Sequence, residues 1–163
     1  MEGQPDWLPE MLDLDGSYEE IIERLYDVFR KDFIQERPKH LSCTVRYNGN
    51  IYEFSQGKVE GFWHVITRYD STKTNRLINY PRAKRLPWAK PLMENPDKDA
   101  IKFFIYDEGS NSKGIRHYIW FENGNYVVIL RKRRDDFFWI TAFYVDDHKR
   151  KDLQRRFEQR IGP

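Results

Sequence analysis

The 163-residue sequence has only one cysteine, Cys43, and no long apolar segment. A single cysteine cannot form an intramolecular disulfide, which favours a reducing compartment. No apolar run approaches the roughly 20 residues that a membrane-spanning helix needs. The N-terminus is acidic, whereas a secretory signal peptide begins with a basic segment followed by an apolar one. These absences predict a cytoplasmic protein with no membrane partner.

Motifs for metals and cofactors are also missing. The four histidines and the cysteine do not occur in CxxC, HxxxH or HExxH spacings, so the sequence predicts no metal site. It contains no GxxxxGKS/T or GxGxxG loop for nucleotide phosphates and no GxSxG segment for a nucleophilic serine. We therefore expect chemistry that needs neither a metal nor a cofactor.

The composition is that of one folded domain with an uneven charge. Hydrophobic residues make up 39% of the chain and aromatic residues 16%, which is too apolar for a disordered segment despite 33% charged residues. Residues 1–23 contain eight acids and no lysine or arginine, so residues 24–163 carry 18 acids against 28 bases. This asymmetry favours an anionic partner, and the alternative is an ordinary solvated surface with an acidic arm.

The first third of the chain contains signals for an arm, a helix and a hairpin. We expect residues 1–15 to form a loosely docked acidic arm and residues 16–163 to form one domain. Ser17 and Glu20 have the spacing of a capping box, and apolar residues follow at helical intervals until Pro38 bars continuation. Asn48-Gly49, flanked by β-formers over 42–54, predicts the tip of a β-hairpin.

The rest of the chain is dominated by strands. Residues 57–68 have a periodicity that fits either a short helix or a strand, residues 69–81 predict an exposed loop, and residues 82–95 predict a short helix. Strands are expected over 101–106, 116–121, 126–130 and 137–145, with a turn at Asn123-Gly124 and a terminal helix that begins after Asp146. This order predicts an α+β fold in which an antiparallel meander packs against helices on one face.

His64 is the residue most suited to chemistry. It interrupts the apolar segment Phe62–Ile66 and is followed by Arg68. A histidine titrates near neutrality and can exchange a proton with a ribose 2′-hydroxyl, while arginine stabilises the charge of a phosphorane-like transition state. The alternative is a partly buried core histidine with no catalytic role.

Basic and aromatic residues alternate in several later segments, a pattern that suits single-stranded RNA because bases stack on aromatic rings. The alternatives are solubilising hairpin tips and core aromatics. The candidate RNA-binding residues are Trp88, Lys84, His117, Arg131 and Arg133.

Three segments together resemble a known family. They are Phe62-Trp63-His64-Val65-Ile66-Thr67, Arg85-Leu86-Pro87-Trp88, and Tyr126–Leu130 followed by Trp139-Ile140-Thr141-Ala142-Phe143-Tyr144. In order and spacing they resemble the phage-associated branch of the barnase–EndoU–colicin E5/D–RelE-like (BECR) nuclease superfamily. The resemblance covers roughly residues 60–160 and leaves the N-terminal helix and hairpin as an extension.

The resemblance implies metal-independent RNA cleavage by attack of the 2′-hydroxyl on the adjacent phosphate. His64 would be the acid or base, Arg85 the main phosphate-stabilising residue and Thr141 a donor to a phosphate oxygen, with Arg68 and Arg116 as further candidates. The sequence does not identify a residue for the second acid or base role. A toxin or phage-encoded effector is the expected context, and an immunity or regulatory protein is a candidate partner.

Two other functions remain open from the sequence. One is a nucleic-acid-binding module without catalysis. The other is a protein-interaction domain whose acidic arm docks elsewhere or covers the basic face of its own domain. The enzyme requires His64, Arg85 and Thr141 to converge in one cleft, whereas the binding module requires only a basic face with exposed aromatic residues. The interaction domain predicts that the three residues are scattered or buried and that the surface has an apolar patch instead.

Overall fold

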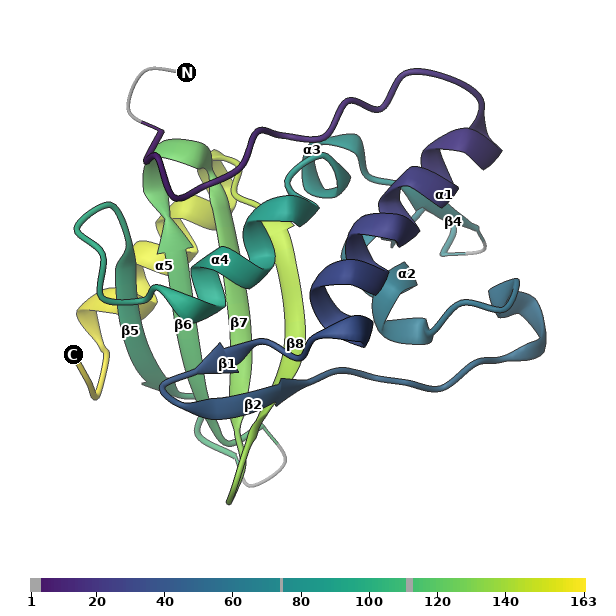
Figure 1. The fold of residues 1–163 in the computed structure, drawn as a ribbon. Helices are drawn as coiled ribbons and strands as arrows, with labels where there is room; N and C mark the ends of the chain where they lie inside the picture. Colours follow the sequence, from purple (N-terminus) through teal and green to yellow (C-terminus); the bar gives the residue numbers. More distant parts are fainter. Residues whose placement is uncertain (1–3, 74, 111–112) are drawn as a thin grey trace.

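A curled six-stranded sheet carries helices on both of its faces (Figure 1). The computed structural model describes residues 4–73, 75–110 and 113–163. The strands of the sheet are β1 (Lys39–His40), β2 (Cys43–Arg46), β5 (Lys102–Asp107), β6 (Ile115–Phe121), β7 (Tyr126–Lys132) and β8 (Phe137–Tyr144). The α-helices are α1 (Tyr18–Phe29), α2 (Glu60–Ile66), α3 (Tyr80–Ala83), α4 (Ala89–Glu94) and α5 (Asp147–Glu158).

The sheet has the order β1-β2-β8-β7-β6-β5. Strands β5 to β8 form the antiparallel meander that the sequence predicts, with the β6–β7 turn at Glu122–Gly124. Strand β2 pairs in parallel with the start of β8, through Val45 opposite Phe137. The mixed α+β class is therefore confirmed, and the parallel β2–β8 pairing adds a feature that local patterns do not reveal.

Alternation along the strands divides the core into two layers. On β6, Ile119 and Phe121 pack with the larger cluster under α1, α2 and α4, whereas Tyr118 and Trp120 pack with Leu153 on the other face. Figure 1 shows α5 behind the sheet and α4 in front of it, with α1 to α3 beside β8. The expectation that all helices lie on one face is wrong, because β5 to β7 are apolar on both faces and the second face needs a cover.

Helix α1 begins where the sequence predicts, but the docking of the N-terminal arm and the continuation of the helix beyond α1 differ from the expectation. The capping box is present, since the Glu20 amide donates to Ser17 Oγ and the Ser17 amide donates to Glu20 Oε1. The arm is docked more firmly than expected: Leu8 is buried, and Trp88 Nε1 donates to the carbonyl of Pro9 at 2.8 Å. Beyond α1 the helix continues as a π-helix over Arg30–Gln35.

The hairpin predicted around Asn48-Gly49 is wrong. Strand β2 pairs instead with β1 through a tight turn at Leu41 and Ser42, and residues 47–52 are irregular. The carbonyls of Asn48 and Asn50 accept hydrogen bonds from the amides of Gly61 and Glu60, at 2.8 Å each. The turn signal is overridden because this segment satisfies the free amides at the start of α2.

Residues 57–81 contain more regular structure than the sequence indicates. Helix α2 ends at Ile66 and leads directly into β3 (Thr67–Tyr69), which pairs with β4 (Arg76–Ile78). The predicted exposed loop is therefore mostly a two-stranded hairpin. Among the described residues, no helix has both the length and the apolar character needed to cross a membrane.

Candidate functional site

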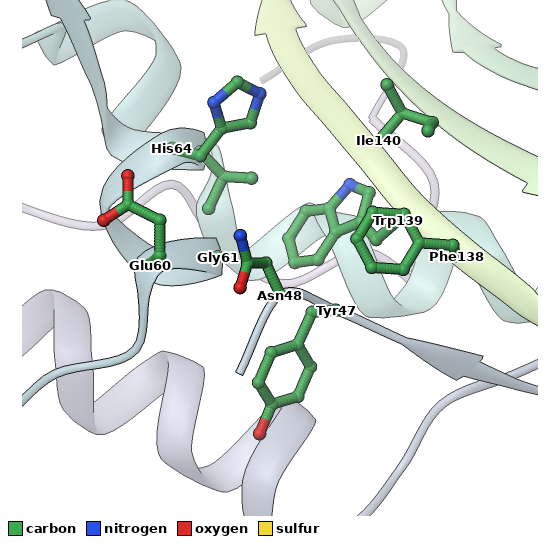
Figure 2. A pocket seen from close by; sticks show the side chains of 9 residues that line it. Tyr47, Asn48, Glu60, Gly61, His64, Phe138, Trp139 and Ile140 are labelled. Atoms are coloured by element: carbon green, nitrogen blue, oxygen red, sulfur yellow. The ribbon is translucent and has the colours of Figure 1, made fainter. Parts of the chain in front are cut away.

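A pocket of about 260 Å³ lies between α2 and β8. Figure 2 shows Glu60 and His64 extending from α2 on one side and Trp139 and Ile140 on β8 on the other. Tyr47 and Asn48, which follow β2, complete the lining. Residues from three distant segments therefore form this pocket, and His64 is the histidine that borders it.

Close packing at Gly61 sets the position of α2. A Cβ atom at this position would lie 3.0 Å from the Asn48 carbonyl oxygen and 3.3 Å from its nitrogen. Only glycine allows the helix to approach the segment after β2 so closely, because any side chain would meet backbone atoms. This contact brings Glu60 and His64, which are one helical turn apart, alongside β8.

The side chain of His64 is exposed at the edge of the pocket, and the positive charges of Arg82 and Arg76 act on it. Desolvation lowers its pKa, and the charges of Arg82 and Arg76 lower it further. The carboxylate of Glu60 and a hydrogen bond to the backbone of Ile140 act in the opposite direction. Since the balance lies below the ordinary value of 6.5, the imidazole is mainly neutral at pH 7 and is ready to accept a proton.

Arg82 on α3 connects that helix to the end of α2. Its Nη1 atom donates to the carbonyls of His64, at 3.0 Å, and of Thr67, at 3.1 Å. The residue is buried, its Nε atom has no hydrogen-bond partner among the described residues, and burial lowers its pKa. Arg82 thus places a positive charge at the carboxyl end of α2 and fixes the backbone of His64.

Two further cations lie near Arg82. Lys149 on α5 packs its ammonium over the ring of Phe143 at 4.5 Å, and its pKa is lowered by desolvation and by the charges of Arg82 and Arg68. Arg68 is exposed on β3. In the described part of the chain neither Arg68 nor Lys149 forms an ion pair with a carboxylate. Arg68, Arg82 and Lys149, hereafter the basic cluster, therefore offer positive charge to an anion.

Arg85 lies near the C-terminal end of β8, whereas His64 borders the middle of this strand. Its Nε donates to the Gly124 carbonyl at 2.9 Å, its Nη1 donates to the Pro81 carbonyl, and its guanidinium stacks 4.7 Å from the ring centre of Tyr144. His64 instead borders Ile140, four residues earlier on the strand. Arg85 does not line the pocket, and no contact among the described residues joins it to His64.

Thr141 follows Ile140 on β8 and pairs with Ile129 on β7. A register shift between Ile129 and Leu130 accommodates an extra residue on β8 at this point. Thr141 is partly exposed on the face of the sheet that α5 covers only in part. It lies next to a pocket residue but does not line the pocket itself.

The predicted arginines of the hairpin ends lie on that same face. Arg116 pairs with Arg131, and Arg131 pairs with Phe138, across three neighbouring strands. Arg133 stacks on Phe138 at 5.4 Å and shares the carboxylate of Asp136 with Arg46. They form a basic strip beside the pocket that ends at Phe138, a pocket residue.

Three other predicted RNA-binding residues have different environments. Trp88 is fully buried, so it offers no exposed face on which a base could stack. His117 is buried, and its Nδ1 lies 3.0 Å from Nε2 of His40. Lys84 is partly exposed, and its carbonyl anchors the arm by accepting from the Leu12 amide. Trp88 and His117 are therefore core residues in this structure.

The structure adds Glu60, Arg82 and Lys149 to the residues identified from sequence. Glu60 could have been found, because a carboxylate four residues before His64 occupies the same helix face. Arg82 and Lys149 lie 18 and 85 positions after His64. The packing of α3 brings the charge of Arg82 to His64, and the packing of α5 brings Lys149 to Arg82. Within the described ranges no group of three or more histidine, cysteine, aspartate or glutamate side chains could hold a metal ion.

No family model matches this sequence, and no curated protein or solved structure matches it either. What can be inferred about function therefore depends on the geometry and charge of these residues.

Proposed function

We propose that this chain is a metal-independent endoribonuclease whose site is the α2–β8 pocket with the basic cluster. The observation that carries the proposal is the position of His64. A mainly neutral imidazole borders a pocket and is affected by the charge of Arg82, and Arg82 in turn lies near Arg68 and Lys149, which have no carboxylate partner among the described residues. A proton acceptor next to unneutralised positive charge is what cleavage of a phosphodiester by a neighbouring hydroxyl requires.

In the proposed reaction, His64 takes the proton of a ribose 2′-hydroxyl. The 2′-oxygen attacks the adjacent phosphorus, and the bond from phosphorus to the 5′-oxygen of the next nucleotide breaks. Lys149 donates a proton to that leaving oxygen, and the products are a 2′,3′-cyclic phosphate and a free 5′-hydroxyl. Arg68 stabilises the charge on the phosphoryl oxygens, while Arg82 positions His64 through its carbonyl.

The test is incubation of the purified protein with total cellular RNA in EDTA. We expect cleavage by the wild type and a loss of about 10²–10⁴-fold in rate for His64→Ala, the range for removal of a general base. His148→Ala is the matched control, because His148 is exposed on α5 and does not line the pocket. Equal rates for the wild type and His64→Ala would refute the proposed role of His64.

A nucleic-acid-binding module without catalysis is the second candidate, supported by the basic strip of Arg116, Arg131 and Arg133 beside Phe138. For this function the same assay gives no cleavage, but binding of single-stranded RNA weakens steeply with salt. Arg116→Ala would then lower the slope of log affinity against log salt by about 0.7. An unchanged slope would exclude Arg116 from the RNA interface.

A further inference from the structure

The Asn48-Gly49 segment, whose sequence indicates a turn, lies against the start of α2, and Asn48 lines the α2–β8 pocket. The described residues that line this pocket include no lysine or arginine. Arg82 acts on His64 electrostatically but does not line the pocket. A phosphate group inside the pocket therefore also needs a neutral hydrogen-bond donor from the lining, and the amide of Asn48 has two N–H groups.

Two hydrogen bonds fix the orientation of Asn48. Its backbone carbonyl accepts from the Gly61 amide at 2.8 Å, which attaches the residue to the first turn of α2. Its side-chain Oδ1 accepts from the Asn50 amide at 3.0 Å, and this bond distinguishes the oxygen of the side-chain amide from its nitrogen. Nδ2 has no acceptor among the described residues, so both of its N–H groups are available to a ligand.

The free nitrogen of Asn48 and the ring of His64 border the same pocket. Figure 2 shows Nδ2 on the side of the amide that is turned toward His64. The hydrogen bond between His64 and the backbone of Ile140 raises the pKa of the imidazole, so the ring is the donor in that bond. The other ring nitrogen of the neutral imidazole is then an acceptor. The pocket thus combines one acceptor, on His64, with one donor, on Asn48.

We infer that the side-chain amide of Asn48 donates to a non-bridging oxygen of the phosphate that is attacked in this pocket, and stabilises the negative charge that this oxygen gains in the transition state. The inference rests on the proposed function for the identity of the phosphate as part of RNA. The 2′-hydroxyl that His64 deprotonates and the phosphate that it attacks are neighbouring groups of one nucleotide. An acceptor and a donor that border one pocket can therefore contact both groups at once.

The charge of Glu60 explains why a neutral donor suits this position. Glu60 lines the pocket as well, and its Oε1 forms an ion pair with Nη2 of Arg76 at 2.5 Å. This ion pair offsets the repulsion between the carboxylate and a phosphate. A lysine or arginine in place of Asn48 would be attracted to Glu60, whereas an amide has no net charge and keeps its N–H groups for the ligand.

The first test is the kinetics of RNA cleavage in EDTA by Asn48→Asp. Aspartate keeps the oxygen that accepts from the Asn50 amide but replaces the free donor with an acceptor. We expect kcat to fall by about 10²–10³-fold, the range for removal of a donor to a developing oxyanion. Asn50→Asp is the matched control, because it makes the same change of charge two residues away at an exposed side chain whose Nδ2 donates to Tyr52. Asn50→Asp should keep kcat within about twofold of the wild type. An equal kcat for Asn48→Asp and the wild type would overturn the inference.

The second test uses the wild type, so it does not depend on the folding of a variant. The side-chain amide signals of ¹⁵N-labelled protein are followed by NMR during titration with a 2′-deoxy dinucleotide, which has a phosphodiester but lacks the attacking hydroxyl. We expect the Asn48 side-chain signals to shift saturably and those of Asn50 to stay in place. Unshifted Asn48 signals, or equal shifts at Asn48 and Asn50, would overturn the inference.

The failure of this inference and the failure of the proposed function are distinguishable. Saturable shifts of the Asn48 signals without RNA cleavage by the wild type would refute the enzyme and support the phosphate contact. RNA cleavage that depends on His64 but proceeds with the same kcat in Asn48→Asp would support the enzyme and overturn the role of Asn48.

Discussion

The α2–β8 pocket and the His40–His117 pair both contain histidines whose pKa is lowered chiefly by desolvation. Their other properties differ. His64 borders a cavity with cations nearby, whereas His40 and His117 are enclosed between β1, β6 and α4 and contact Phe103 and Phe137. A lowered pKa therefore does not distinguish a functional histidine from a structural one, and the surroundings of the ring have to be compared.

Hydrogen bonding fixes the tautomers of the buried pair. His40 Nδ1 lies 2.9 Å from the Met93 carbonyl, which can only accept, so His40 is protonated at Nδ1. Its Nε2 then accepts a hydrogen bond from His117 Nδ1 at 3.0 Å. In the neutral pair each of these nitrogens therefore has a matching donor or acceptor. Protonation of His40 Nε2 would place its N–H against the N–H of His117 Nδ1, so that two donors face each other.

The largest expected effect is acid destabilisation through this pair. The pKa of His117 falls from 6.5 to about 4 in the folded protein, mainly because burial disfavours the charged ring. The unfolded state therefore binds more protons below pH 6.5, and stability is lost as the pH falls from 6.5 towards 4. We expect about 3 kcal/mol to be lost over this interval, measured by urea unfolding at successive pH values.

The matched variant for this prediction is His117→Leu, which fills the site but cannot donate to His40. We expect it to cost about 2 kcal/mol at pH 7 and to reduce the dependence of stability on pH below 6.5. His148→Ala is the control and should change neither the stability at pH 7 nor its dependence on pH. If the free energy of unfolding of the wild type does not change between pH 6.5 and 4, the assignment of a lowered pKa to His117 is contradicted.

The second effect concerns the rate of RNA cleavage. Because the neutral form of His64 accepts the proton in the proposed reaction, the rate should be near its plateau at pH 7 and should fall as the pH decreases through the lowered pKa of His64. Below that pKa we expect about a tenfold decrease per pH unit. A rate that rises on acidification would make His64 the acid instead of the base.

The third effect is the loss of one hydrogen bond that docks the arm. Trp88→Phe keeps a buried ring but removes the donor to the Pro9 carbonyl, so we expect a loss of about 1 kcal/mol in the free energy of unfolding. Tyr52→Phe, at an exposed ring outside this contact, is the control. No change in Trp88→Phe would show that the arm contributes nothing to stability through this bond.

Much of the fold was predictable because its signals are local. The capping box at Ser17, the meander of β5 to β8 and the Asp146 cap each depend on residues a few positions apart. The Asn48-Gly49 signal failed because the carbonyls of this segment are used by α2, and the parallel pairing of Val45 with Phe137 spans 92 residues. Such distant pairings have no local pattern.

The candidate site was predictable only in part for the same reason. His64 is evident as a polar residue in an apolar segment, and Glu60 lies one helical turn before it. Arg82 and Lys149 contribute through the packing of α3 and α5, which no spacing in the sequence indicates. Arg85 carries the family-like motif, yet its guanidinium is used to hold Gly124 and to stack on Tyr144.

One paired measurement tests the comparison most directly: RNA cleavage in EDTA and urea unfolding at pH 7, both for His64→Gln and His117→Leu. We expect His64→Gln to lose cleavage while its free energy of unfolding changes by less than about 0.5 kcal/mol. His117→Leu should retain cleavage under conditions where it is folded and should lose about 2 kcal/mol of stability. Cleavage retained in His64→Gln, or lost in folded His117→Leu, would contradict the assignment of function to the α2–β8 pocket.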